Sequence, residues 1–321
     1  MMKRECACAA EDARAGAECA GRTLAFADAD AATGGAFGGG VARDEDAAPS
    51  FGMRACGVLC GILVAVCLVG CGFLACVLPP VTHTLSSAYA KDYESPFTKD
   101  ELVQVADATR SYAFGAHDRA ALLRAIYMAN VERQADTALV RAGAPRLSAG
   151  SVEEAAALDD ATIASELSGA QSRYAYDDAT IGHLDDCARI AYAAYPALAA
   201  IAAAACVLTV ATYRTTARTS GAAEAKRLVG HALRNAGIGV CALFAVAGAA
   251  AAYNFNAFFG VFHSLFFTQG TWVFDDDSLL ICALPTDFWI GMGAAWLATT
   301  LTASILCVLV GWRMAKASRA A

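Results

Sequence analysis

Charged residues are scarce in this sequence of 321 residues. Only 17% are Asp, Glu, Lys or Arg and 57% are hydrophobic, whereas about a quarter of a soluble globular chain is charged. The composition therefore argues against an ordinary soluble enzyme and excludes disorder over the whole chain. Basic residues are not in excess either, since the net charge is -7, so the sequence lacks the electrostatic signature of nucleic-acid binding. A membrane protein with a sizeable polar part is the class that remains.

Several common catalytic motifs are missing as well. The sequence contains no His-Glu-x-x-His zinc motif, no Gly-x-Ser-x-Gly elbow, no Walker motif and no Gly-x-Gly-x-x-Gly pattern. We therefore expect no metal, no nucleotide and no other cofactor. Ser264 and Cys282 stay open as hydrolase nucleophiles, although neither stands in a recognised motif.

Long apolar runs, in contrast, are abundant. The hydrocarbon core of a bilayer is roughly 30 Å thick, so a helix crosses it with about 20 apolar residues. Four segments meet this requirement, at 55–78, 190–213, 235–253 and 288–312. Because only helices and closed barrels satisfy their backbone groups in lipid, we predict an all-α polytopic membrane protein with four transmembrane helices.

The distribution of Lys and Arg predicts the orientation, because these residues favour the cytoplasmic side. The segment 214–234 has five basic residues and one acidic residue, and the tail 313–321 has three basic residues and no acid. The segment 254–287 has four Asp and neither Lys nor Arg. We therefore expect both termini and a basic loop at 214–234 in the cytoplasm, with 79–189 and 254–287 outside. Residues 1–54, rich in Ala, Gly and acids, are expected to form a disordered cytoplasmic extension.

The outer segment 79–189 is long enough for an extracytoplasmic helical cap domain. Thr98 and Glu101 have the spacing of a capping box before an apolar helical stripe, and Gly115 stands where that helix should stop. Since β-branched alternation is rare in the segment, the cap should be entirely helical. Further helices are predicted at 119–141, at 152–167 and from about residue 179 into the second span.

Most of the 13 Cys lie in the apolar runs or in the N-terminal extension, and in an apolar run Cys acts as a small apolar residue. Cys187 and Cys282 are the two that fall in the outer segments. One disulfide between them is possible in an oxidising exterior, and two free thiols are the alternative.

Two of the five histidines have unusual neighbours. His183 lies seven residues before the second span, and Asp186 shares its helical face and could orient its ring. His263 lies in an uncharged aromatic stretch at 255–267, which is too short to span a bilayer but can dip into the outer leaflet. An ionisable group at that depth is costly without a partner, so His263 is a functional candidate. By residue type alone, His183 could equally be a helix-surface histidine, and solvated or interfacial positions are expected for His83, His117 and His231.

The aromatic segment carries a resemblance to a known family. The pattern Phe262-His263, Phe267, Trp272-Val273-Phe274, then 280–285 and Phe288-Trp289 resembles the bacterial integral-membrane lipoprotein intramolecular transacylase (Lit) family. The motif His183-x-x-Asp186 just before a span is similar to that family too. The region 117–171 departs from the pattern by being longer.

This resemblance implies four spans, cytoplasmic termini, an extracytoplasmic cap and a place in the bacterial cell membrane. It implies migration of the sn-2 acyl chain of a diacylglyceryl-modified lipoprotein cysteine to the α-amino group of the same cysteine. Diacylglyceryl lipoproteins and membrane lipid would be the partners. The family's two functional histidines would correspond to His263 and His183. We assign His263 as general base and His183 as proton donor or as the partner of that donor, with Asp186 orienting His183. The aromatic residues expected to line the loop and accommodate acyl chains are Phe258, Phe259, Phe262, Phe266, Phe267 and Trp272.

A non-enzymatic membrane module, such as an assembly partner or a transporter-associated subunit, is the alternative. The Ala- and Gly-rich second and third spans favour it because small residues allow close helix packing. Geometry separates the two hypotheses. Facing imidazoles favour the enzyme, whereas rings more than about 10 Å apart favour the module, because proton transfer needs hydrogen-bond reach.

Overall fold

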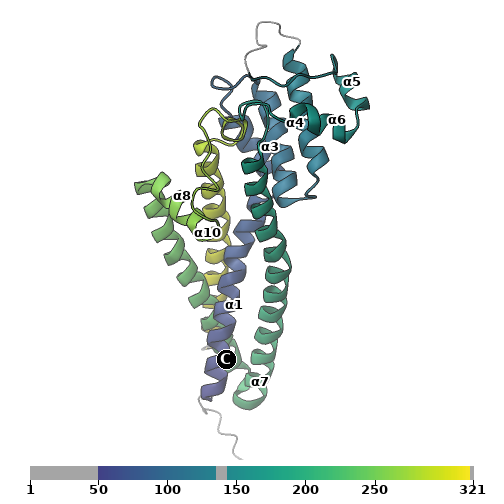
Figure 1. Cartoon of the computed structure of the whole chain (residues 1–321). Coiled ribbons are helices and arrows are strands. Elements are labelled where there is room, and N and C mark those ends of the chain that lie inside the picture. The colour runs from purple at the N-terminus through teal and green to yellow at the C-terminus, as the bar shows by residue number, and fades with distance from the viewer. Residues whose placement is uncertain (1–49, 135–142, 319–321) are drawn as a thin grey trace, which may run out of the picture. The chain divides into compact units, whose positions relative to one another are not determined.

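The computed structural model describes residues 50–134 and 143–318, and all regular secondary structure in these ranges is α-helical (Figure 1). This confirms the all-α prediction. Of the predicted extension 1–54, residues 1–49 lie outside the described ranges, as do 319–321 at the other end of the chain.

Within the described ranges, three helices are long and apolar enough to cross a membrane: α1 (Phe51–Cys76), α7 (Asp178–Tyr253) and α10 (Thr286–Ala317). The 76-residue α7 consists of two helices that meet at a kink, where Gly221 has φ 88° and ψ 159°. A positive φ favours glycine because it has no Cβ. Figure 1 shows the chain reversing direction at this kink, so α7 contains both the second and the third predicted span.

The segment 214–234 was predicted to be a basic loop, but the structure shows it as helix. It is helical except at Gly221, where the chain turns. One residue suffices for the reversal because Gly221 reaches a conformation closed to other residues, while the flanking Ala, Lys and Arg residues are good helix formers.

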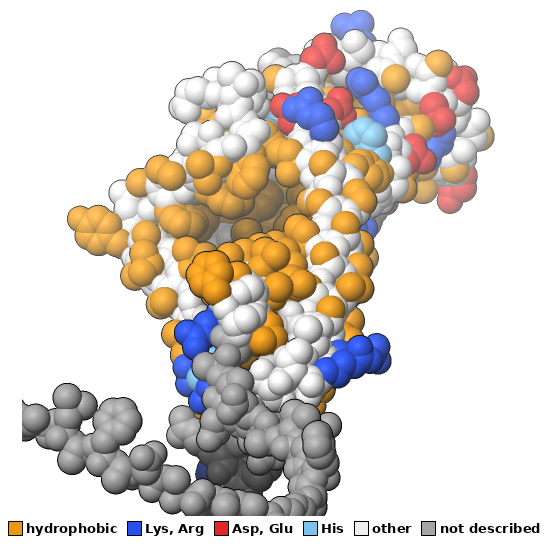
Figure 2. Space-filling view, turned by 90° about the horizontal axis from the view of Figure 1, so that it is seen from below, with side chains coloured by type: hydrophobic (Ala, Val, Ile, Leu, Met, Phe, Trp, Pro, Cys, Tyr) orange, Lys and Arg blue, Asp and Glu red, His pale blue; other side chains and the backbone are white. Residues whose placement is uncertain are grey.

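The surfaces of the long helices are apolar. Val58 on α1, Val207 and Val246 on α7 and Leu306 on α10 are all more than half exposed. Figure 2 shows hydrophobic side chains over this region and around a hollow in it, whereas charged side chains gather towards the ends. Apolar side chains exposed over the length of a helix are typical of contact with lipid.

The long helices pack through small residues. On α7 and α10, Gly230 and Gly311 approach so closely that a Cβ added to Gly230 would lie 2.7 Å from the Gly311 carbonyl oxygen. Such contacts let helix backbones approach in an apolar environment.

The segment before α7 folds into short helices around an apolar core that includes Leu102, Ile126 and Tyr127. A capping box at Thr98 is present as predicted, with the Glu101 side chain accepting from the Thr98 backbone N–H, and Gly115 caps the same helix. The helices are α2 (Pro79–Tyr89), α3 (Lys99–Phe114), α4 (Arg119–Gln134), α5 (Val152–Ala157) and α6 (Asp160–Leu167).

The helix predicted at 152–167 is broken into α5 and α6. Asp159 takes an extended conformation and its side chain accepts from the Thr162 backbone N–H, so it starts a new helix. Asp favours such an N-cap position over a helix interior. The end of the helix predicted at 119–141 lies partly outside the described residues, since α4 is described to Gln134.

The predicted aromatic loop at 254–287 is partly helical. It contains α8 (Phe255–Ser264), capped by the Asn254 side chain, and the short α9 (Leu279–Ala283). Leu279 and Cys282 are fully buried in the apolar core that the helices before α7 form. The Leu279 N–H donates to the Ser172 carbonyl at 2.9 Å, which ties α9 to the segment before α7. The segment before α10 is thereby held against the short helices that precede α7.

Candidate active site

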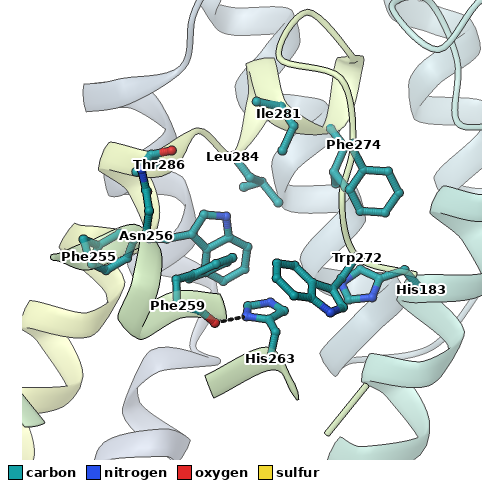
Figure 3. A pocket seen from close by; sticks show the side chains of 12 residues that line it. His183, Phe255, Asn256, Phe259, His263, Trp272, Phe274, Ile281, Leu284 and Thr286 are labelled. Atoms are coloured by element: carbon teal, nitrogen blue, oxygen red, sulfur yellow. Dashed lines mark hydrogen bonds between the residues drawn. The ribbon is translucent and has the colours of Figure 1, made fainter. Parts of the chain in front are cut away.

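A partly open pocket of about 100 Å³ lies where α7, α8 and α9 meet (Figure 3). Its walls are mainly aromatic and aliphatic, and two histidines provide the ionisable groups. The lining residues are His183, Phe255, Asn256, Phe259, His263, Trp272, Phe274, Leu280, Ile281, Leu284, Thr286 and Trp289.

His263 lies one helical turn after Phe259 on α8, and their ring centroids are 3.9 Å apart. Its Nδ1 lies 3.0 Å from the Phe259 carbonyl oxygen. Because a carbonyl only accepts, Nδ1 carries the proton, and Nε2 of the neutral ring keeps a free lone pair. The side chain is buried, and this burial lowers the pKa of His263, partly offset by the bond to Phe259. His263 is therefore a neutral imidazole suited to accepting a proton.

His183 lies in the second turn of α7, whose start is fixed by the Asp177 side chain. Its ring packs against Phe267 at 4.8 Å and against Phe274 at 5.6 Å, measured between ring centroids. The Cys187 sulfur lies 3.7 Å from Nε2. Nδ1 is buried and has no hydrogen-bond partner among the described residues. This half-buried ring thus presents one nitrogen that is not engaged by the fold.

The two histidine rings face the same pocket. Their centroids are 6.2 Å apart and their planes differ by 28°. Two imidazoles so close in apolar surroundings disfavour each other's protonation, so the pair carries at most one positive charge near neutral pH.

Asp186 is placed differently from the orienting role expected for it. Its carboxylate lies 2.8 Å from Arg189, three residues further along α7. The neighbour of the His183 ring on its own helix is instead the Cys187 thiol. Any influence of Asp186 on His183 is through charge at a distance, and its role stays a prediction.

The aromatic residues expected around the site have different positions. Phe259 and Trp272 line the pocket. The ring centroids of Phe262 and Phe267 lie 5.8 and 5.5 Å from that of His263. Phe266 packs on Phe262 and is 49% exposed. Phe258 is half-buried on α8 and is not among the lining residues.

The sequence pattern at 280–285 and at Phe288-Trp289 contributed to the family resemblance, but Ile281, Leu284 and Trp289 were not predicted to line the site. Asn256 was also missed, although its spacing to Phe259 and His263 is that of one helical face. That signal becomes visible once the stretch is treated as a helix rather than a loop.

The remaining groups considered from the sequence lie elsewhere. His83 pairs with Asp107 at 2.8 Å on the surface, and His117 stacks on Tyr112. Cys187 and Cys282 are both free thiols in this structure. Within the described ranges, no group of three His, Cys, Asp or Glu side chains is placed to hold a metal ion.

Comparison with known proteins finds a family model that matches the part of the chain containing this pocket. Residues 161–289 match the sequence model of the family described as lipoprotein intramolecular transacylase Lit. The matched segment contains every residue that lines the pocket. A solved structure, the in meso structure of the membrane integral lipoprotein intramolecular transacylase Lit from Bacillus cereus, is similar with a TM-score of 0.48 and 16% identity. That alignment covers 84% of this chain and 98% of the other. The search of curated proteins found no match.

Proposed function

We propose that this chain, whose residues 161–289 match the model of the lipoprotein intramolecular transacylase Lit family, is a membrane acyltransferase. Its substrate is a lipoprotein whose N-terminal cysteine carries a diacylglyceryl group. The enzyme moves the sn-2 acyl chain to the α-amino group of the same cysteine, giving an N-acylated lyso-form lipoprotein. The observation that carries the proposal is the pair of imidazoles, 6.2 Å apart, across an apolar pocket inside the matched segment.

The reaction requires no nucleophile from the enzyme, because both the amine and the ester belong to the substrate. It requires a base for the amine proton, and a donor for the carbonyl oxygen and the leaving alkoxide. We assign the base to Nε2 of His263, whose Nδ1 proton is held by the Phe259 carbonyl.

We assign the donor to His183. The Cys187 thiol, 3.7 Å from Nε2, can donate to that nitrogen, which places the ring proton on the unengaged Nδ1. Nδ1–H then supplies a proton or a hydrogen bond to the reacting oxygen. The lone pair of one ring and the proton of the other complement each other, as a base and an acid must.

Positioning supplies a large part of the acceleration in this scheme. When two reacting groups are held in the correct geometry, effective molarities reach about 10⁵–10⁸ M. The aromatic walls of the pocket, including Phe259, Trp272 and Trp289, hold the glyceryl region while its acyl chains extend into lipid.

α8 is suited to that connection with the lipid. Val261 on α8 is 64% exposed, and Leu265 and Phe266 directly after it are 72% and 49% exposed, whereas His263 on α8 is buried. A short apolar helix that exposes such side chains can lie at the membrane surface with these side chains in the acyl region. We place the pocket at the outer leaflet of the bacterial cell membrane, with four crossings, two of them on α7, and both termini in the cytoplasm.

The proposal is tested by mass spectrometry of a lipoprotein's N-terminal peptide from bacterial cells that lack transacylase activity of this kind. The cells express the chain as wild type, His183→Ala, His263→Ala or, as a matched control, the surface variant His83→Ala. We expect an N-acylated lyso-form peptide with the wild type and His83→Ala, and an unchanged diacylglyceryl peptide with the two pocket variants.

An unchanged peptide with folded, membrane-inserted wild-type protein would contradict the proposal. The non-enzymatic assembly or transporter-associated module would then be the better hypothesis. In that case the close Gly230–Gly311 packing and the other small-residue contacts would be the features to explain.

A further inference from the structure

The pocket contains a second buried N–H group that the fold leaves without a partner. The indole Nε1 of Trp272 is inaccessible to solvent and has no acceptor among the described residues. The Nδ1 of His183 is in the same state. A buried donor without an acceptor loses its hydrogen bond to water and gains nothing in return, and a buried Trp N–H usually finds a partner.

These two donors are distinguished by their location. The other buried side-chain nitrogen and oxygen atoms without a partner in the described ranges lie outside the pocket, on Asp107, Arg110, Arg173, Thr300 and Ser304. Among the described residues, only Trp272 and His183 combine a buried, unpartnered side-chain nitrogen with a place in the pocket wall. Two such donors at one cavity indicate a site for an oxygen atom with developing negative charge.

The fold holds the indole beside the proposed base. The Trp272 and His263 ring centroids are 4.9 Å apart, with planes inclined by 39°. Trp272 also packs against α8 at Gly260, where an added Cβ would lie 3.7 Å from the indole ring. Figure 3 shows the indole of Trp272 beside His263 and with His183 beyond it. The preceding turn is closed by Thr271, whose hydroxyl donates to the Thr268 carbonyl at 2.9 Å.

We propose that Trp272 is a further catalytic residue, whose indole N–H binds the carbonyl oxygen of the migrating acyl ester and stabilises the oxyanion. This inference rests on the proposed acyl transfer and deepens it. Trp272 was expected from the sequence only to line the loop, and a lining role needs the ring but not its N–H.

The step balances as follows. The α-amino nitrogen attacks the ester carbonyl carbon, a C–N bond forms, and the π electron pair of the carbonyl moves onto its oxygen. That oxyanion accepts from Nε1–H of Trp272 and Nδ1–H of His183, while Nε2 of His263 takes the proton from nitrogen. The C=O bond then re-forms, the bond to the sn-2 oxygen breaks, and the departing alkoxide receives the proton. The net change is one C–N bond gained, one C–O bond lost and one proton moved from nitrogen to oxygen.

The test separates the N–H group from the ring. Position 272 is replaced by 3-benzothienylalanine, which keeps the bicyclic shape and has sulfur in place of N–H, and separately by Phe in Trp272→Phe. The full chain in detergent is assayed with a synthetic diacylglyceryl-cysteine lipopeptide. Since loss of one oxyanion donor costs about 10²–10³-fold in kcat, we expect a fall of roughly that size in both variants. KM and the shape of the pH profile should stay as in the wild type, because the indole does not titrate in this range.

Trp312→Phe is the matched control, because Trp312 is half exposed on α10 and does not line the pocket. Its ring faces the Lys316 ammonium group in a cation–π contact. It should leave kcat unchanged. If the benzothienyl variant keeps kcat within about threefold of the wild type, Trp272 acts through its ring alone and the inference is wrong while the acyl transfer stands. If Trp272→Phe unfolds, the shape-preserving variant decides. A wild-type chain that forms no lyso product overturns both the transfer and the role of Trp272.

Discussion

Two histidines lie on opposite sides of the start of α7, and the fold treats them differently. His117 is exposed, with Nδ1 at 3.0 Å from the Tyr112 carbonyl and Nε2 at 3.7 Å from the Asp185 carboxylate. His183 is half-buried between aromatic rings, and its Nδ1 has no partner among the described residues. Asp185 and His183 are two residues apart, so their side chains project from the helix in directions about 200° apart. The fold thus satisfies one histidine and leaves the other available for a ligand.

The largest effect should come from breaking this contrast at the imidazoles of the pocket. His263→Gln and His183→Gln remove a base and a donor, and general acid–base groups contribute about 10²–10⁴-fold. We expect the initial rate of lyso-lipopeptide formation to fall by that order. His117→Gln, on the satisfied side of α7, should stay within about twofold. Comparable losses in all three variants would show that the contrast has no functional meaning.

The pH dependence provides the next test. Burial lowers the pKa of His263 from the usual value of about 6.5, and a base acts only when it is unprotonated. The acid limb of kcat, which reports groups in the enzyme–substrate complex rather than the α-amino group of the free substrate, should therefore have its midpoint below 6.5, with a tenfold loss per pH unit below the midpoint. Folding stability has the same sign. The unfolded chain binds the proton more readily, so stability is lost as pH falls from about 6.5 towards the lowered pKa.

The measurement is a pH–rate profile of the wild type in one detergent, with circular dichroism at each pH to separate inactivation from unfolding. A midpoint at or above 6.5 with the protein folded would contradict a buried neutral base. His83→Ala should leave the midpoint in place, because that surface histidine does not contact the pocket.

The helical class and the two candidate histidines could be predicted because they depend on local pattern. The capping box at Thr98 and the stop at Gly115 are readable over a few residues. The helix α8 was predicted as a loop, since its aromatic run lacks the polar alternation that reveals a helical period. The place of Ile281 and Leu284 in the pocket wall could not be predicted. These residues reach the pocket because α9 is buried in the apolar core, and sequence spacing does not encode such a tertiary contact.

A smaller effect is expected at Asp186, where sequence and structure suggest different roles. Its carboxylate pairs with Arg189 rather than with the ring of His183. Asp186→Asn keeps the shape and removes the charge, and we expect kcat to fall by less than about fivefold, since only a charge at a distance is lost. The control is Arg189→Gln, which breaks the same pair from the other side. A fall of a hundredfold in Asp186→Asn alone would restore the orienting role inferred from the sequence.

The smallest effect on turnover should come from the satisfied side of α7. The Tyr112 hydroxyl donates to Asp185, and burial together with this bond raises the pKa of Tyr112 to about 12, so the hydroxyl stays a donor at all working pH values. Tyr112→Phe removes one hydrogen bond, which costs about 1 kcal/mol of stability. Thermal unfolding in detergent should show a lower midpoint, while kcat stays within about twofold. The first turns of α7 remain held by the Asp177 side chain, which caps the helix, and by Ile181 and Leu184, which are buried in the apolar core. A large fall in kcat without a change in unfolding would mean that the two sides of the helix are coupled, and that His183 depends on Tyr112 for its position.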